Sequence, residues 1–133
     1  MNTYDCEPTL TDSEVLEFCK KGFLILDSVV PPEINEKTTA YASQNPSLQP
    51  SDLGREEWFR EHVLCNDALS GALRSLLGAN FILPSQISNH RSECPNPVAQ
   101  DWHWDGGSKY GPEINYLHVF YYPEGCRREM GPT

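Results

Sequence analysis

The sequence predicts an α+β fold in which a helical first part is followed by a strand-rich second part. Apolar residues recur at helical spacing in several segments before residue 79. Residues 114–122, by contrast, are dense in aromatic and β-branched side chains, as in a strand that is covered on two sides. A length of 133 residues suits one domain. We therefore predict a single domain over residues 1–133, helical over about 1–79 and β over about 80–133.

The first helix is predicted to begin at Asp12. Thr11 followed by Glu14 fits a capping box, in which each residue accepts a hydrogen bond from the backbone of the other. Gly22 fits the position just past the last turn, where a left-handed backbone ends a helix.

A buried strand, a second helix and a loop are predicted to follow Gly22. Residues 23–27 are a short apolar run bounded by a glycine and a polar pair, which indicates a buried strand. Pro31 and Pro32 open a helix through about Ser43, because proline is tolerated in a first helical turn. Residues 44–54 are polar and contain two prolines, so they are predicted to form a loop.

Two more helical segments are predicted over residues 55–64 and 67–77, with strands after them. Leucines form an apolar stripe along residues 67–77, and Gly78 closes that helix. Residues 80–90 are strand-like, and residues 92–100 hold two prolines and read as a loop. Residues 114–122 then form the second strand of this part.

The charge balance excludes some classes of partner. Ten lysine and arginine residues stand against nineteen aspartate and glutamate residues, a formal charge of −9. Nucleic acid and anionic membrane surfaces need a basic face, so both are disfavoured as partners. The N-terminus has no basic region followed by an apolar core, and no apolar run approaches the ~20 residues of a spanning helix. We therefore expect a soluble, cytoplasmic protein.

The five cysteines are scattered, and none belongs to a Cys-x-x-Cys pair. We expect ordinary reduced thiols. A zinc site that combines His103 with Cys94 or Cys126 is the alternative, and the lack of paired spacing disfavours it.

The run 101–107 holds the strongest candidate for chemistry, His103 and Asp105. Strand side chains alternate between faces, so an extended backbone turns both residues to the same side. An imidazole and a carboxylate are two of the three protein ligands of a mononuclear ferrous site, which needs a second histidine from elsewhere. His118 is the candidate, because residues 114–122 could lie beside the strand that carries His103. A core or pocket histidine is the alternative interpretation of His118.

Four segments, in order and spacing, resemble the phytanoyl-CoA dioxygenase family of Fe(II)- and 2-oxoglutarate-dependent oxygenases. They are the stretch from Leu10-Thr11-Asp12-Ser13-Glu14 through Gly22-Phe23-Leu24-Ile25-Leu26, then His103-Trp104-Asp105-Gly106, then Leu117-His118-Val119-Phe120-Tyr121-Tyr122, and last Met130-Gly131-Pro132-Thr133. In that family the first segment is an acid-capped helix that runs into a strand. His103 and Asp105 match the family's iron-binding His-x-Asp.

The resemblance implies a fold, a reaction and a set of site residues. The fold would be N-terminal helices packed on part of a double-stranded β-helix sheet, a jelly-roll or cupin-like barrel. The reaction would be hydroxylation of a small organic or acyl substrate, with Fe(II) held by His103 and Asp105, 2-oxoglutarate as cosubstrate, and O2. By their place in the family pattern, Gln86, His90 and Phe120 would line the cosubstrate or substrate pocket. For Gln86, an edge-strand amide that faces solvent is the alternative.

The sequence departs from the family pattern at its end. Family members continue past the Gly-Pro-Thr-like turn to a distal histidine and to an arginine that pairs with 2-oxoglutarate, and this sequence stops before both. We therefore expect a dioxygenase domain truncated at its C-terminal side, with an incomplete barrel. The alternative is a catalytically inactive family member that acts as a metal-binding or protein-interaction module. The sequence leaves both interpretations, the substrate and the oligomeric state open.

Overall fold

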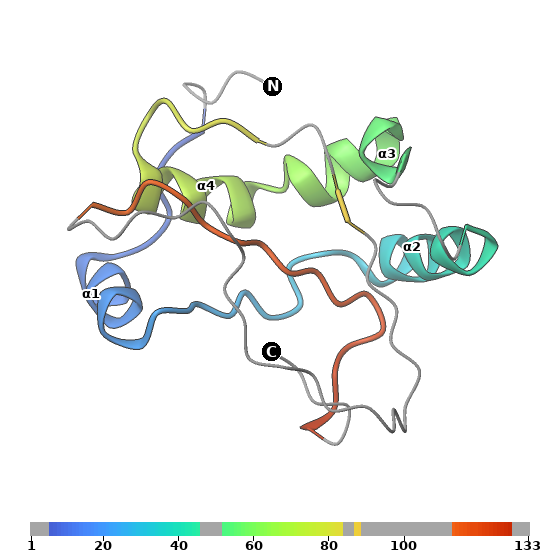
Figure 1. The fold of residues 1–133 in the computed structure, drawn as a ribbon, viewed down its shortest axis with the longest axis horizontal. Helices are drawn as coiled ribbons and strands as arrows, with labels where there is room; N and C mark the ends of the chain where they lie inside the picture. Colours follow the sequence, from blue (N-terminus) through green and yellow to red (C-terminus); the bar gives the residue numbers. More distant parts are fainter. Residues whose placement is uncertain (1–5, 46–51, 84–86, 89–112, 129–133) are drawn as a thin grey trace.

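The computed structural model describes residues 6–45, 52–83, 87–88 and 113–128. In chain order the elements are α1 (Asp12–Lys21), α2 (Pro32–Gln44), the 3-10 helix η2 (Asp52–Arg55), α3 (Glu57–Phe59), the π-helix η3 (Arg60–Leu64) and α4 (Asp67–Leu77). Figure 1 shows α4 and α3 along one side of the molecule, with α1 near one end and α2 near the other. Residues 113–128 cross this group of helices. Within the described part of the chain, no helix combines the length and the apolarity that crossing a membrane requires.

The predicted α+β fold class is wrong. The regular elements among the described residues are helices, and these residues contain no β-strand, sheet or barrel. Ile87 has an isolated bridge, which does not extend into a strand among these residues. The expected jelly-roll sheet is therefore not formed by residues 23–27 or 114–122, nor by the described residues of the segment 80–90, which are 80–83 and 87–88. We predicted all three segments to be strands.

The segments 23–27 and 114–122 have strand-like compositions without a sheet to join. Phe23 is 59% exposed and Ile25 is 74% exposed, so the first segment is not buried as predicted. A turn at Asp27 and Ser28, where Ser28 has a φ of 56°, ends it. Strand propensity measures how well a residue fits a pleated, half-buried surface. A segment with that propensity becomes a strand only where neighbouring strands pair with it.

The predicted start and end of α1 are confirmed. The backbone N–H of Glu14 donates to the Thr11 hydroxyl at 3.3 Å, and the backbone N–H of Thr11 donates to the Glu14 carboxylate at 2.8 Å. These two bonds are the capping box. At the other end, Gly22 has a φ of 80° and its N–H donates to the Phe18 carbonyl at 2.7 Å. The left-handed backbone that only glycine adopts readily therefore ends the helix.

Replacing Thr11 by alanine is expected to lower the free energy of unfolding by about 1 kcal/mol, because the first turn of α1 loses its side-chain acceptor. The pH profile should change as well. The backbone N–H of Thr11, and then its hydroxyl, lower the pKa of Glu14 below its usual value. Such a carboxyl adds stability above its unfolded pKa and loses it as the pH falls through the folded pKa. In urea denaturation from neutral pH to about pH 3, the free energy of unfolding should therefore fall less in Thr11→Ala than in the wild type. An equal loss in both proteins would count against the capping role.

The core lies where α2, η2, α3 and η3 meet. Its buried side chains are Ile34, Leu53, Phe59 and Val63. Residues 55–64 were predicted as one helical segment, and the structure divides them. The helix changes pitch at Arg60, where the N–H of Cys65 reaches the Arg60 carbonyl at 2.7 Å, five residues back.

The predicted helix over 67–77 is confirmed, and Gly78 follows it. The side chain of Asn66 caps its first turn by accepting from the N–H groups of Ala68 and Leu69, at 3.0 and 3.4 Å. The Asn66 amide also donates to the Val29 carbonyl at 2.9 Å. One side chain therefore starts α4 and fastens the connection between α1 and α2 to it.

Residues 7–10, which we call the N-terminal strap, lie directly on α4. The N–H of Thr9 donates to the Gly71 carbonyl at 3.2 Å, and the N–H of Leu10 donates to the Ser75 hydroxyl at 3.0 Å. A Cβ at Gly71 would come within 2.3 Å of Thr9 Cγ2 and 2.9 Å of the Glu7 carbonyl oxygen. Glycine at position 71 is therefore what lets the strap approach the helix backbone.

Candidate functional site

Most residues predicted to form the metal and cosubstrate site lie outside the described part of the chain. These are His103, Asp105, Gln86 and His90. The metal pair and these two pocket residues therefore stay predictions. His118 and Phe120 are described, and both lie on the segment 113–128.

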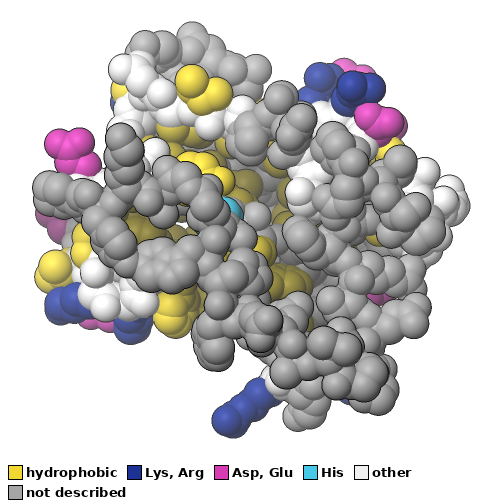
Figure 2. Space-filling model, viewed as in Figure 1, with side chains coloured by type: hydrophobic (Ala, Val, Ile, Leu, Met, Phe, Trp, Pro, Cys, Tyr) yellow, Lys and Arg dark blue, Asp and Glu magenta, His cyan; other side chains and the backbone are white. Residues whose placement is uncertain are grey.

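Residues 116–122 place an aromatic ring on one side at every second position. Tyr116, His118, Phe120 and Tyr122 are exposed, and we call them the aromatic face. Of the residues that alternate with them, Leu117 and Tyr121 are half-buried, whereas Val119 is 52% exposed. Alternate side chains of an extended chain point to opposite sides, so the segment has the periodicity of a strand without belonging to one. Figure 2 shows hydrophobic side chains gathered near the middle of the molecular surface.

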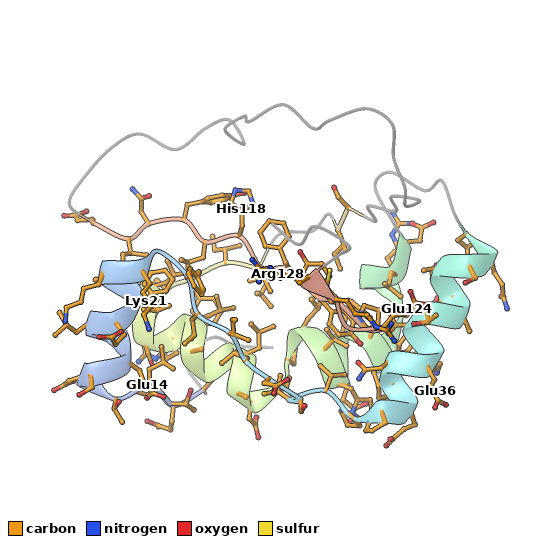
Figure 3. The ribbon with its side chains drawn as sticks, turned by 90° about the horizontal axis from the view of Figure 1, so that it is seen from below. Glu14, Lys21, Glu36, His118, Glu124 and Arg128 are labelled. Carbon is orange, nitrogen blue, oxygen red and sulfur yellow. The ribbon has the colours of Figure 1, made fainter. Side chains whose placement is uncertain are left out.

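The imidazole of His118 lies between two rings of the aromatic face. The ring of Tyr116 meets it edge-on, with centroids 4.8 Å apart and planes at 86°. The ring of Phe120 is stacked, with centroids 6.0 Å apart and planes at 20°. Both distances fall in the range of favourable ring contacts. In Figure 3, His118 lies on the side of the segment that faces away from the helices.

The exposure and the ring contacts of His118 affect how its imidazole could bind a ligand. The imidazole is at the surface, and its neighbouring rings limit the orientations it can adopt. Among the described residues, no group of three or more histidine, cysteine, aspartate or glutamate side chains could hold a metal ion. A metal at His118 would therefore need ligands from outside the described residues, and ligation by His118 stays a prediction.

Tyr121 anchors the segment to the helices from its other side. Its hydroxyl donates to Asn35 Oδ1 at 2.6 Å and lies 3.5 Å from the Thr38 hydroxyl, both on α2. Its ring packs against Phe59, with centroids 6.1 Å apart. Burial raises the pKa of Tyr121 above its usual value, and the hydrogen bond with Thr38 opposes part of that rise. The protonated phenol is therefore the form that the fold favours.

The variant Tyr121→Phe is expected to lower the free energy of unfolding by about 1 kcal/mol, because the Asn35 amide oxygen loses its donor. A phenol whose pKa is raised on folding adds stability below its unfolded pKa and loses it as the pH rises through the folded pKa. Above about pH 10, the difference in the free energy of unfolding between wild type and variant should therefore become smaller. Urea denaturation at neutral and alkaline pH measures this difference. Tyr116→Phe, at a residue that is 60% exposed, is the control and should change the free energy of unfolding little. A difference between wild type and Tyr121→Phe that widens as the pH rises would contradict the anchor.

Phe120 was predicted to line the cosubstrate pocket. The structure places its ring at the surface, 59% exposed, against the imidazole of His118. The described residues thus bring two predicted site residues, His118 and Phe120, into contact. The pocket role of Phe120 stays a prediction.

Two features of this segment were missed by the sequence reasoning. The aromatic face was readable as aromatic residues at positions 116, 118, 120 and 122, a period of two. The composition of residues 114–122 instead predicts a strand that is covered on two sides, without separating an exposed aromatic side. The anchor between Tyr121 and Asn35 joins residues that are 86 positions apart, and no local pattern signals such a contact.

Comparison of the chain with models of protein families, with curated proteins and with solved structures finds no match in any of the three.

Proposed function

We propose that this chain carries part of the active site of an Fe(II)- and 2-oxoglutarate-dependent oxygenase. The observation that carries the proposal is the His103-Trp104-Asp105-Gly106 motif, followed at family spacing by the aromatic run that includes His118 and Phe120. The proposal does not need a closed barrel. A short extended stretch is enough to turn a histidine and an aspartate two positions apart to the same side.

The roles of the residues follow from their chemistry. His103 would donate a ring nitrogen and Asp105 a carboxylate oxygen to Fe(II), a donor set that suits ferrous iron with open positions. The metal with 2-oxoglutarate and O2 would supply the oxidation of a C–H bond in a small organic or acyl substrate. Phe120 would present an apolar ring near the cosubstrate, and Gln86 and His90 would donate hydrogen bonds to it or to the substrate. Because the imidazole must be neutral to bind, metal affinity should fall as the pH is lowered.

An anaerobic titration tests this function. We expect Fe(II) and 2-oxoglutarate together to give the weak visible charge-transfer band of the chelated complex, and succinate to form when air is admitted. The variants His103→Ala and Asp105→Ala should lose the band, and His62→Ala, on an exposed position of η3, should keep it. Loss of the band in His118→Ala would identify His118 as a further ligand. A wild-type protein that is folded and binds no Fe(II) by calorimetry would rule the proposal out.

The second candidate function is a noncatalytic interaction module derived from such an oxygenase. The observation that favours it is the number of large apolar side chains left at the surface of the described residues, among them Ile25, Ile82 and Tyr116. Where exposed apolar side chains form a contiguous patch, the patch often marks a surface that binds other proteins. A folded chain that gives no charge-transfer band would support this candidate over the enzyme.

A further inference from the structure

Residues 114–122 carry no lysine, arginine, aspartate or glutamate. The nine residues, Ile-Asn-Tyr-Leu-His-Val-Phe-Tyr-Tyr, also lack proline and glycine. The formal charge of −9 on the whole chain is therefore carried elsewhere. An uncharged segment with high strand propensity and no proline is the composition that pairs readily with an identical segment.

The structure leaves this uncharged segment at the surface. Tyr116 is 60% exposed and Val119 is 52% exposed. None of residues 114–122 belongs to a strand. Proteins usually protect exposed segments of this composition with charges or prolines inside them. Here the nearest such residues, Glu113 and Pro123, lie outside both ends of the segment.

The anchor at Tyr121 keeps the aromatic face pointing outward. Its hydroxyl bonds Asn35 and its ring contacts Phe59, so the segment is held against the helices at Tyr121. The ring contacts of His118 with Tyr116 and Phe120 order the opposite side. The segment thus has exposed apolar side chains at the spacing of a strand.

We propose that residues 114–122 pair with the same residues of a second copy of this chain. Antiparallel pairing about a two-fold axis uses one patch on both copies, so an uncharged, self-similar segment suits it. Centred on His118, this register sets Tyr116 of one copy opposite Phe120 of the other. Aromatic pairs across neighbouring strands are favourable.

The size of the patch predicts a weak, reversible dimer. A fully covered aromatic side chain buries about 150–250 Å². The rings of the aromatic face are already partly covered, so two copies bury on the order of 1,000 Å² together, at the low end of specific interfaces. We expect a dissociation constant on the order of micromolar or weaker. Salt should strengthen the dimer, because it screens the repulsion between two acidic copies.

Sedimentation of the full chain over a range of protein and salt concentrations tests the pairing. The double variant Tyr116→Lys/Val119→Lys changes two exposed residues of the segment and should raise the dissociation constant about tenfold or more. The control Ile25→Lys/Ile82→Lys adds the same charge at positions that are 74% and 90% exposed outside the segment. We expect it to dimerise as the wild type does. Circular dichroism checks that the helices of both variants are intact.

Hydrogen exchange locates the contact. In the wild type, the amides of residues 114–122 should become more protected as protein concentration rises, and in Tyr116→Lys/Val119→Lys they should not. A wild type that is monomeric at every concentration and salt would overturn the pairing. So would an equal weakening in the control variant, since association would then follow charge or general apolarity. Protection that is independent of concentration would also overturn it, since the segment would be covered by its own chain.

Discussion

Replacing Phe59 by alanine is expected to lower the free energy of unfolding by about 3–5 kcal/mol. Phe59 is only 3% exposed and belongs to the buried cluster with Ile34 and Val63. Its ring also contacts Trp58 at 5.7 Å and Tyr121 at 6.1 Å between centroids. Alanine would remove the ring and leave a cavity between the helices and the segment 113–128. Because small domains are stable by only about 5–15 kcal/mol, this one change would bring the protein close to unfolding.

Urea denaturation followed by circular dichroism measures this loss. Phe59→Leu, which fills part of the cavity, should lose less than Phe59→Ala. Ile82→Ala is the matched control at a side chain that is 90% exposed, and it should change stability by a few tenths of a kcal/mol at most. If Phe59→Ala and Ile82→Ala behaved alike, the assignment of Phe59 to the core would be wrong. Hydrogen exchange should also show less protection around Tyr121 in Phe59→Ala, because that ring loses its support.

Gly71→Ala is expected to destabilise the protein by about 1–3 kcal/mol. Local propensity alone predicts the opposite sign, because alanine in a helix interior is favoured over glycine by up to about 1 kcal/mol. At position 71 the steric clash of the added Cβ outweighs the gain in helix propensity. The added Cβ would lie 2.3 Å from Thr9 Cγ2, 2.6 Å from Thr9 Oγ1 and 2.9 Å from the Glu7 carbonyl oxygen. The N-terminal strap would have to move away and lose the bond between the Thr9 N–H and the Gly71 carbonyl.

A double-mutant cycle with Thr9→Ala separates these contacts. Removing the Thr9 side-chain atoms relieves the two closest contacts and leaves the one with the Glu7 carbonyl oxygen. The double variant should therefore be more stable than the sum of the two single changes predicts. Thermal and urea unfolding give the four free energies. Strict additivity, or a gain of stability in Gly71→Ala alone, would show that the strap does not press on α4.

The helices could be predicted because their signals are local. Thr11 and Glu14 cap α1 with bonds that span three residues, and Gly22 and Gly78 end helices by their own backbone preference. Such signals act within one or two turns, so a single stretch of sequence contains them. The division of residues 55–64 among the end of η2, α3 and the π-helix η3 was not predicted. The pitch changes where the core packs around Phe59 and Val63, and periodicity alone does not show that.

The prediction of strands was wrong because a strand is stabilised by residues outside its own segment. Residues 23–27 and 114–122 have the composition of strands, and the structure gives neither a partner strand among the described residues. A helix satisfies its backbone within its own sequence, whereas a strand depends on residues far away in the chain. The fold-class prediction was therefore wrong, because it depended on strands at these two segments.

In the candidate site too, local features could be predicted from the sequence, whereas contacts between distant residues could not. The pairing of His103 with Asp105 depends only on a two-residue spacing, and the sequence predicts it without tertiary information. The contacts of His118 with Tyr116 and Phe120 have the same short range. The hold of Tyr121 on Asn35 and Phe59 depends on how the chain packs, and only the structure shows it.

The strap on α4 has a consequence for how the protein is made. Leu10 bonds Ser75, 65 residues further along the chain, and Thr9 rests on Gly71. During synthesis from the N-terminus, the strap is translated long before α4, the helix on which it lies. α1 can form early from its own caps, but the residues in front of it must wait until α4 has left the ribosome. Closing so long a loop is entropically costly and slow, so this contact should form among the last in folding. A protein fused ahead of residue 6 would therefore act on the final stage of folding rather than on its beginning.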